Sequence, residues 1–405
     1  MKSKESLLIL GAGIYQVPLI KRAKSRGFKT IVVSIPGNYP GFEIADTVYY
    51  KNTTDKESIL RIAEEEKVSA IVTTGTDVAV VSMGYVCSRL GLCGLSEEAG
   101  KKLTDKAVMK ETFVRGGVST SEFVKVTSYD EAEKAVEKLG VPVMLKIVDK
   151  SGSRGIVKIN DKRELDRAYR YASKATNAPH MIVEKFVDGR EIGIDAFVQN
   201  GKLLLMLPHE KYVYHSANTD IPIGHICPMQ TSEKLYNNIL RETEKIIECA
   251  GLDNCEINID AFVLEDETVS IIEAAGRCGA TGIPEVISGY TGRDYYDCIL
   301  DNALGIEVEP FDLSQCRPTA SLLLYSEKSG ILDEVKYCFN GKTYRNENAR
   351  EGFESVEISF SPGDEIDGFM NGTDRIGMAV FCADTTEQLR QKVESFRSAL
   401  SVKVK

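Results

Sequence analysis

Hydrophobic and polar positions alternate with a regular rhythm over residues 7–104. Short apolar runs, the first of them Leu7-Leu8-Ile9-Leu10, are separated by amphipathic stretches at about 17–25, 55–66 and 77–90. Apolar runs of this length predict buried strands, and amphipathic stretches of this length predict helices that pack on those strands. The first hundred residues therefore predict an open, parallel α/β sheet of Rossmann-like form.

The pattern changes after Gly94, where amphipathic stretches at 96–104 and 105–116 follow each other directly. Strand-like runs dominate from about 180 and favour an antiparallel sheet. The last hundred residues carry short strands, turns with glycine and a final amphipathic stretch near 385–399. The expected fold class is a multidomain α/β and α+β protein with a Rossmann-like domain (1–104), a two-lobed middle domain (105–305, with lobes of about 105–180 and 181–305) and a small α+β C-terminal cap (306–405).

The composition is that of an ordinary soluble globular protein. Of 405 residues, 43% are hydrophobic and 27% are charged, and 60 acidic residues against 50 Lys and Arg give a net charge of −10. Apolar runs stay well below the ~20 residues that span a bilayer. An acidic chain does not attract nucleic acid or an anionic membrane, so neither is an expected partner.

Ten cysteines are scattered along the chain, without a CxxC pair or a regular spacing. Such cysteines, placed among apolar residues, are typical of reduced thiols in cytosolic proteins. Residues Lys2 to Glu5 run straight into the first apolar run, without the longer apolar core or cleavage site of a signal peptide. These features predict a cytoplasmic location.

The first strand-to-helix turn reads Gly11-Ala12-Gly13-Ile14-Tyr15-Gln16. Its GxG opening suits a tight turn, but Gln16 stands where a dinucleotide-binding fingerprint has its third glycine. The second predicted strand ends at Ser34 rather than at an acidic residue that could bind a ribose. A tight structural turn is therefore favoured over an NAD-dependent oxidoreductase, and a small-ligand role for this loop stays open.

Two lysines and a small polar loop indicate an anion site in the middle domain. Lys146 follows the apolar run Val143 to Leu145 and stands three residues before the segment Asp149 to Ile156. This segment is rich in Gly and Ser, and a lysine beside backbone N–H groups suits a phosphate. Lys106 lies at a predicted helix start, where the helix dipole favours a bound anion. The alternatives are a surface hairpin turn and a solvated helix lysine.

A charged segment, Glu184-Lys185-Phe186-Val187, follows the next apolar strand, and Glu191 comes seven residues after Glu184. An extended segment presents its backbone N–H and C=O groups to the edge of a flat heterocycle. One carboxylate could then meet a base and the other a sugar. The alternative is an exposed strand with alternating charges, which is common on protein surfaces.

Two further carboxylates stand inside apolar runs. Asp260 lies within Ile257 to Val263 and Glu273 within Ile271 to Ala275, and a hairpin-like turn separates them. If these strands pair, two neighbouring buried carboxylates would repel, and Mg²⁺ that holds substrate phosphates is a usual solution. Arg277 follows four residues after Glu273, and its planar guanidinium presents several hydrogen-bond donors. The alternative is an ion-paired structural cluster.

The order of these parts resembles that of the ATP-grasp superfamily, close to its biotin carboxylase-like, carbamoyl phosphate synthetase-like and L-amino acid ligase branches. Six segments carry the resemblance, which covers essentially the whole chain: TDKAVMK, PVMLK, SGSRG, VEKFVDGRE, NIDAF and IEAAGRCGATGIPE. Each motif is loose, but six in the same order are hard to obtain by chance. The resemblance implies a pre-ATP-grasp domain, a two-lobed ATP-grasp domain and a cap over the ranges given above.

The resemblance also implies ATP and Mg²⁺ as cofactors, with Mn²⁺ as a substitute. Lys106 and Lys146 match the pair that holds the ATP phosphates, and Asp260 and Glu273 match the two metal-binding carboxylates. Arg277 matches the arginine that steadies the acyl phosphate. The other matches are the loop over the phosphates (Ser151, Gly152, Ser153, Arg154 and Gly155), the adenine hinge (Glu184, Lys185, Phe186 and Val187), the ribose-binding acid (Glu191), a γ-phosphate contact (Lys211) and a substrate-side segment (His225 and Gly279).

One position departs from the family pattern. The family commonly has asparagine two residues after the second carboxylate, and here that position is Ala275. One metal ligand is therefore missing or is supplied from elsewhere, with Asn258 as the candidate. His225 retains the alternative interpretation of a plain loop histidine.

The activity implied by the resemblance is an ADP-forming ligation of a small-molecule carboxylate, such as an amino acid, to an amine through an acyl phosphate. Carboxyphosphate chemistry on bicarbonate is an alternative, although the sequence shows no biotinyl-carrier segment such as AMKM. A nucleotide-binding regulatory protein without catalysis is a second alternative, motivated by Ala275. The resemblance also predicts a homodimer, whereas the substrates are named by no motif.

Overall fold

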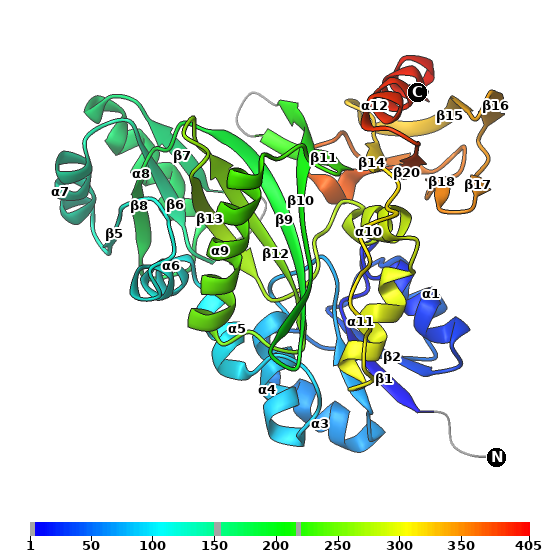
Figure 1. The fold of residues 1–405 in the computed structure, drawn as a ribbon, viewed down its shortest axis with the longest axis horizontal. Coiled ribbons are helices and arrows are strands. Elements are labelled where there is room, and N and C mark those ends of the chain that lie inside the picture. Colours follow the sequence, from blue (N-terminus) through cyan, green and yellow to red (C-terminus); the bar gives the residue numbers. More distant parts are fainter. Residues whose placement is uncertain (1–4, 150–154, 216–219) are drawn as a thin grey trace. The chain divides into compact units, whose positions relative to one another are not determined.

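The computed structural model describes residues 5–149, 155–215 and 220–405 (Figure 1). The predicted loop residues Ser151, Gly152, Ser153 and Arg154 lie outside these ranges. The mixed α/β and α+β architecture expected from the sequence is confirmed. The chain divides into two compact units, which we call unit 1 (Met1–Met206, Thr231–Arg277 and Leu300–Val308) and unit 2 (Leu207–Gln230, Cys278–Ile299 and Glu309–Lys405).

Unit 1 begins with a four-stranded parallel sheet in the order β3-β2-β1-β4, as the alternating apolar runs predict. The central strand β1 is buried along its whole length, because it has a neighbour on each side and helices around it. The strands are β1 (Ser6–Leu10), β2 (Lys29–Ser34), β3 (Thr47–Tyr50) and β4 (Ala70–Val72); the helices are α1 (Val17–Ser25), α2 (Pro40–Ile44), α3 (Lys56–Glu66) and α4 (Val80–Leu90).

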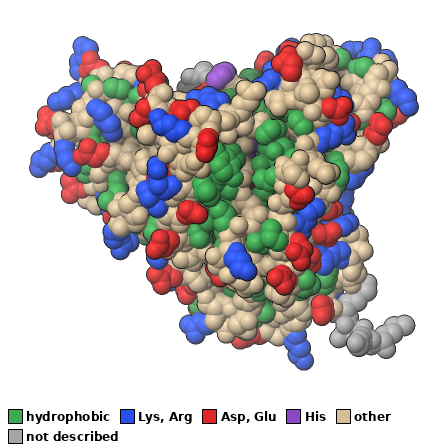
Figure 2. Space-filling model, in the orientation of Figure 1, with side chains coloured by type: hydrophobic (Ala, Val, Ile, Leu, Met, Phe, Trp, Pro, Cys, Tyr) green, Lys and Arg blue, Asp and Glu red, His purple; other side chains and the backbone are tan. Residues whose placement is uncertain are grey.

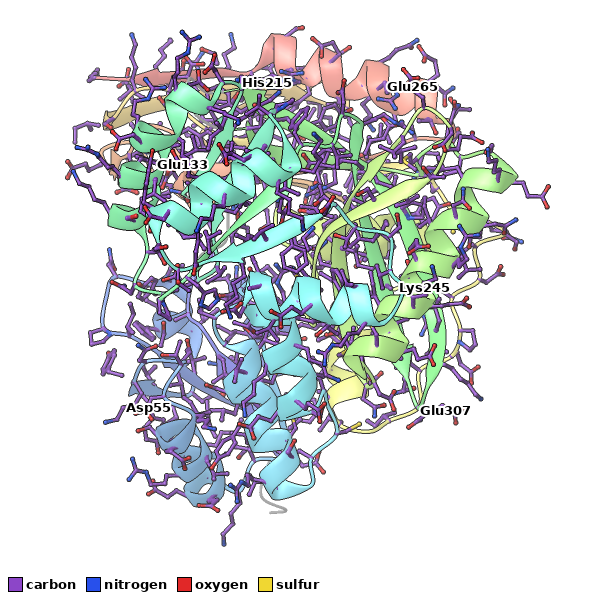
Figure 3. The ribbon with its side chains drawn as sticks, turned by 90° about the vertical axis from the view of Figure 1, so that its left-hand side faces the viewer. Asp55, Glu133, His215, Lys245, Glu265 and Glu307 are labelled. Carbon is purple, nitrogen blue, oxygen red and sulfur yellow. The ribbon has the colours of Figure 1, made fainter. Side chains whose placement is uncertain are left out.

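Local side-chain signals set the ends of these elements. Asp55, labelled in Figure 3, accepts a hydrogen bond from the backbone N–H of Ser58 and so begins α3. Gly11 has a φ of +98°, and a Cβ at this position would lie 2.9 Å from the side chain of Gln16. The Gln16 amide donates to the carbonyl oxygen of Thr74. Gln16 thus fills the turn in which a dinucleotide-binding fingerprint carries glycine.

Two consecutive helices, α5 (Glu97–Thr104) and α6 (Lys106–Arg115), follow this sheet. Asp105 separates them, because its side chain accepts hydrogen bonds from the first backbone N–H groups of α6. A four-stranded antiparallel sheet comes next, in the order β5-β8-β6-β7. Its elements are β5 (Phe123–Val126), α7 (Tyr129–Leu139), β6 (Val143–Ile147), β7 (Ile156–Ile159), the 3₁₀ helix η1 (Lys162–Glu164), α8 (Leu165–Ala175) and β8 (Met181–Lys185).

A second antiparallel arrangement in unit 1 has the order β13-β12-β9. Helix α9 packs against β13 and α6, and its Lys245, labelled in Figure 3, donates to the Gly117 carbonyl oxygen at 2.8 Å. Strand β10 begins in unit 1 and ends in unit 2, and helix α11 runs the other way. The elements are β9 (Arg190–Gln199), β10 (Lys202–His215), α9 (Glu233–Ala250), β12 (Cys255–Val263), β13 (Val269–Ala275) and α11 (Tyr295–Ala303).

Unit 2 is built on antiparallel strands, in the order β11-β14-β20-β18-β17. A smaller sheet around β15 and the final helix α12 close its hydrophobic core, in which Phe381 and Phe396 meet edge to face. The elements are β11 (Asp220–Cys227), α10 (Ile283–Thr291), β14 (Thr319–Leu324), β15 (Gly330–Phe339), β16 (Lys342–Arg345), β17 (Ala349–Glu351), β18 (Glu354–Ile358), β19 (Glu365–Ile366), the 3₁₀ helix η2 (Gly372–Asp374), β20 (Gly377–Cys382), α12 (Thr386–Ala399) and β21 (Ser401–Val404).

Three surface and covalent features bear on function. Within the described residues, no helix combines the length and the apolarity that crossing a membrane requires. All ten cysteines lie in the described ranges, and each is a free thiol. On the face drawn in Figure 2, basic and acidic side chains are interspersed rather than gathered by sign. This distribution gives nucleic acid no continuous basic surface on that face.

Candidate active site

The hairpin of β12 and β13 places the two predicted metal-binding carboxylates opposite each other. Asp260 and Glu273 are cross-strand neighbours, and Asn258 stands opposite Ala275 two residues further along the same ladder. Directly opposed side chains in such a ladder have Cβ atoms about 5 Å apart. The strand pairing that the sequence predicted is confirmed, and it brings an asparagine to the position across from Ala275.

Both carboxylates line a cleft of unit 1. Besides Asp149, which follows β6, its charged and amide side chains come from three parts of the sequence: the loop after β4, the start of α6, and the β12–β13 hairpin with the residues that follow it. The residues of this set are Asp77, Lys106, Asn258, Asp260, Glu273 and Arg277, which we call the cleft cluster. The fold therefore brings together four of the predicted site residues and the candidate Asn258, and it adds Asp77.

Lys106 and Glu273 are in direct contact in this cleft. The Lys106 Nζ lies 2.5 Å from Glu273 Oε2, and the two side chains are 13% and 37% exposed. Burial alone would lower the pKa of Lys106, but the attraction and the hydrogen bond of Glu273 outweigh burial, and the pKa is raised. Lys106 therefore stays cationic, next to a carboxylate that solvent can reach.

A second group of charges, the buried cluster, consists of Lys110, Lys146 and Glu184. Lys146 Nζ donates to Glu184 Oε2 at 2.8 Å, and Lys110 Nζ lies 3.5 Å from Glu184 Oε1. The Glu184 side chain is only 4% exposed. Burial alone would raise the pKa of Glu184, but the two lysines reverse this effect and lower it. The cluster thus holds an ionised carboxylate between two ammonium groups.

Lys110 is a residue that the sequence reasoning misses. It lies one helical turn after Lys106 on α6 and is almost completely buried. Its Nζ donates to Thr120 Oγ1 at 2.6 Å and to Ser121 Oγ at 3.2 Å. Burial lowers the pKa of Lys110 to about 8. The spacing of four residues from Lys106 is the sequence signal that could have indicated it, since such residues share a helix face.

Arg277 is held from two sides. Its Nε and Nη2 lie 2.8 and 2.5 Å from Asp77 Oδ1, and its Nη1 donates to Asn258 Oδ1 at 3.0 Å. Asp77 is the second residue that the sequence reasoning misses. The two partners are 200 positions apart, so no local pattern connects them. The structure thus places the predicted arginine in the cleft cluster.

The predicted adenine hinge, residues 184–187, uses its side chains inside the protein. Besides the contacts of Glu184, Lys185 Nζ donates to two carbonyl oxygens at the C-terminal end of α7, at 2.7 and 3.1 Å. The Lys158 Nζ lies over the ring of Phe186, 3.5 Å from its centroid. Glu191, near the start of β9, is exposed. A nucleotide base at this segment would therefore meet backbone atoms rather than the carboxylate of Glu184.

Gly155 is the one predicted loop residue within the described ranges. Its φ is +67°, and a Cβ there would lie 2.4 Å from the Ile147 side chain. The adjoining strands β6 and β7 pair directly, with Lys146 opposite Ile156. Asp149, before the loop, accepts a hydrogen bond from Thr176 Oγ1 at 2.6 Å. Asp149 and Gly155 are thus held in place, and the predicted closure of the loop over phosphates stays a prediction.

The remaining predicted residues, Lys211, His225 and Gly279, lie in unit 2. Lys211 on β10 is the cross-strand neighbour of His225 on β11. The Nδ1 of His225 lies 3.2 Å from the Nδ1 of His209, and both rings are buried. Burial, with His209 and Lys211 as further causes, lowers the pKa of His225 well below its usual range. Unit 2 thus holds an uncharged histidine beside a lysine.

Comparison with known proteins agrees with the motifs. The family model of the ATP-grasp domain matches residues 139–285, and that of the L-amino acid ligase C-terminal domain 2 matches residues 344–405. The crystal structure of phosphoribosylglycinamide synthetase from Anaerococcus prevotii is 30% identical to this chain, with 100% of both chains covered and a TM-score of 0.81. The chain belongs to the ATP-grasp superfamily. The family that the six motifs indicated is thereby confirmed.

Two further relatives of this ATP-grasp chain are ligases. The alanine–anticapsin ligase of Bacillus subtilis (strain 168) is 25% identical over 290 residues, a match that covers 64% of this chain and 60% of that protein. The chain thus spans about 60% of the length of this curated relative. The L-amino acid ligase from Bacillus licheniformis covers 100% of both chains with a TM-score of 0.80 at 19% identity, which shows a shared fold.

The ATP-grasp family implies Mg²⁺, and the donor set of the hairpin fits this ion. Asp260 and Glu273 stand opposite each other, whereas the amide oxygen of Asn258 accepts a hydrogen bond from Arg277. Carboxylate and amide oxygens are the hard donors that Mg²⁺ prefers. Across the described part of the chain, no three His, Cys, Asp or Glu side chains converge as a metal site. The hairpin therefore suits an ion that keeps several water or phosphate ligands.

Proposed function

We propose that this ATP-grasp chain is a ligase that joins a small-molecule carboxylate to an amine and releases ADP and phosphate. The observation that carries the proposal is the contact of Lys106 with Glu273 beside Asp260 and Arg277 in one cleft. A phosphoryl-transfer site needs cations for the phosphate oxygens and carboxylates for a metal ion at the same place. The cleft cluster supplies both.

The proposed reaction has two steps. A carboxylate oxygen bonds to the γ-phosphorus of ATP while the bond to ADP breaks, which gives an acyl phosphate. The amine nitrogen then bonds to the acyl carbon, phosphate leaves, and the nitrogen loses a proton. The chain contributes position and charge: Lys106 and Lys146 hold the phosphates, and Arg277 stabilises the acyl phosphate.

Asp260 and Glu273 would hold the Mg²⁺, and Mn²⁺ is the proposed substitute. When bound, such an ion stabilises negative charge on the phosphate oxygens as a Lewis acid. Glu273 is 37% exposed, so its carboxylate is accessible from the cleft. The residues proposed for the nucleotide are Gly155 with the loop 151–154, the hinge 184–187 and Glu191.

An L-amino acid is the proposed carboxylate substrate. The match to the L-amino acid ligase C-terminal domain and the relationship to an alanine–anticapsin ligase support this choice. Lys211 is the proposed γ-phosphate contact, and His225 and Gly279 are the proposed substrate-side residues. We further propose a cytoplasmic homodimer, for which the molar mass in solution from light scattering is the test.

Two alternative functions differ from the ligase in the substrate they need or in lacking turnover. Carboxyphosphate formation would need bicarbonate in place of the carboxylate. A regulatory protein without turnover is motivated by Ala275, but Asn258 stands across from it in the hairpin and keeps an amide in the ladder. The ligase is therefore favoured.

Phosphate release from Mg·ATP tests the proposal across a matrix of carboxylates and amines that includes the amino acids and bicarbonate, with the nucleotide product identified as ADP or AMP. ADP that forms only when one carboxylate and one amine are both present would establish the ligase and name its substrates. Release with bicarbonate alone would favour the carboxylase. Tight ATP binding with no turnover in the whole matrix would favour the regulatory protein.

A further inference from the structure

Arg277 is held by two polar side chains, one from the loop after β4 and one from strand β12. Asp77 engages its Nε and Nη2 with one carboxylate oxygen, at 2.8 and 2.5 Å. Asn258 engages its Nη1 at 3.0 Å. The Arg277 side chain is 11% exposed and that of Asp77 28%. Three of the five donors of this guanidinium are therefore committed to groups that define the plane and direction of the fork.

The loop that carries Asp77 is fastened to the first turn of the N-terminal sheet. Thr73 Oγ1 donates to the Leu10 carbonyl oxygen at 2.6 Å, and Thr74 Oγ1 donates to the Tyr15 carbonyl oxygen at 2.8 Å. The Gln16 amide donates to the carbonyl oxygen of Thr74 itself. These three bonds fasten Thr73 and Thr74, at the start of the loop, to the end of β1 and to the turn after it. The position of Asp77 is thus set by the N-terminal sheet.

Asn258, the second partner of Arg277, is also held in place. The Asn258 Nδ2 donates to Asp195 Oδ2 at 3.3 Å, and Asp195 on β9 is fully buried. Asn258 and Asp195 are cross-strand neighbours in the β9–β12 ladder. Because the amide nitrogen faces Asp195, the amide oxygen is directed to Arg277. The guanidinium is therefore held between an N-terminal loop and the central strands of the site.

We propose that Asp77 is a positioning residue, which orients Arg277 for the reaction in the cleft. The inference rests on the proposed function, in which Arg277 stabilises the acyl phosphate. An arginine that must meet a short-lived anion is effective only if its fork is aligned beforehand. The N-terminal sheet, which places Asp77, then belongs to the reaction machinery through this one carboxylate.

A double-mutant cycle tests the proposal with Asp77→Ala, Arg277→Ala and the double variant, assayed by phosphate release with the substrate pair found in the matrix. We expect Asp77→Ala to lower kcat about a hundredfold, with little change in the KM for ATP. The double variant should lose no more than Arg277→Ala alone, because Asp77 acts through the arginine. Losses that multiply would overturn the proposal, since Asp77 would then act on its own.

Two further variants supply a conservative substitution and a matched control. Asp77→Asn retains the shape and one acceptor oxygen, so its kcat should fall between that of the wild type and that of Asp77→Ala. Asp301→Asn is the matched control, since Asp301 forms an ion pair with Arg26 at 2.6 Å and is also 28% exposed. Its kcat should equal that of the wild type. An equal loss in the control and in Asp77→Asn would make the effect a general one of lost ion pairs and would contradict the proposal.

A chemical measurement separates this proposal from the proposed function. The rate of phenylglyoxal modification of Arg277, followed by mass spectrometry of its peptide, needs no turnover. We expect severalfold faster modification of Arg277 in Asp77→Ala and an unchanged rate in Asp301→Asn. An unchanged rate in Asp77→Ala would overturn the positioning role even in an active enzyme. A wild type inactive in the whole matrix would overturn the ligase, while the modification rate still decides whether Asp77 holds Arg277.

Discussion

The buried cluster and the cleft cluster are two sets of lysines and carboxylates in the same unit, and they differ in access to solvent. In the buried cluster, Glu184 is 4% exposed and sits between Lys146 and Lys110. In the cleft cluster, Glu273 is 37% exposed beside Lys106. An ion pair with a buried carboxylate is fixed by the cost of separating its charges, whereas a pair with a partly exposed carboxylate exchanges partners at lower cost. The first cluster therefore suits positioning, and the second suits ligand exchange.

Glu273→Gln breaks the cleft cluster and has the largest expected effect. The substitution keeps the size of the side chain but removes the charge that meets Lys106 and the proposed Mg²⁺. We expect turnover, measured as ADP formation with the identified substrates, to fall about a thousandfold. The free energy of unfolding should change by less than ~1 kcal/mol, since the pair is partly exposed.

Glu265→Gln is the matched control for this change. Glu265 lies in the exposed turn between the same two strands and is labelled in Figure 3. Its substitution should leave turnover unchanged. Wild-type turnover in a folded Glu273→Gln protein would remove the carboxylate pair from the proposed mechanism.

A pair of lysine variants sharpens the contrast between the clusters. Lys110→Met takes one cation from the buried Glu184, and we expect the free energy of unfolding in urea to fall by about 3 kcal/mol. Lys106→Met, one helical turn earlier, should abolish most turnover and change stability by less than ~1 kcal/mol. If Lys106→Met is the more destabilising of the two, exposure does not separate the clusters as argued.

Glu256→Gln examines burial of a carboxyl that has no cationic partner to lower its pKa. Burial raises the pKa of Glu256 from 4.5 to about 7, although Asn302 donates to it at 3.4 Å. Below pH 4.5 the carboxyl is protonated in both the folded and the unfolded chain. As the pH rises to about 7, only the unfolded chain loses the proton, so stability is lost through this window.

The expected result for Glu256→Gln is therefore pH-dependent. At pH 8 the variant should be more stable than the wild type by about 3 kcal/mol, and at pH 4 the two should be alike. Urea unfolding at both pH values is the measurement. A stabilisation of the same size at both pH values would show that it does not come from the proton.

The sequence predicts those parts of the molecule that local patterns determine. The helices predicted at about 17–25 and 55–66 follow from apolar spacing, and the structure gives them as Val17–Ser25 and Lys56–Glu66. The pairing of Asp260 with Glu273 follows from two apolar runs joined by a short turn, since a hairpin leaves few registers open. The roles of these carboxylates and of the lysines stay predictions.

The long-range contacts could not be predicted in the same way. Asp77 and Arg277 are in contact although they lie 200 positions apart in the sequence. Lys110 contacts Glu184 only because α6 packs against β8. A lysine at the start of a helix and a lysine one turn later look alike in sequence. Their difference in burial arises from packing, which a period of 3.6 residues does not describe.

The ladder between Asn258 and Ala275 has a consequence for how sites of this kind are compared between proteins. Motif comparison runs along one strand at a time, so it counts the alanine as a loss. In a sheet, however, neighbouring positions on one face come from two strands, and Asn258 lies directly opposite Ala275. The hairpin of this chain thus carries an amide although the motif on the second strand lacks one. Where a chain lacks a motif residue on one strand, the position paired with it on the neighbouring strand should be inspected as well.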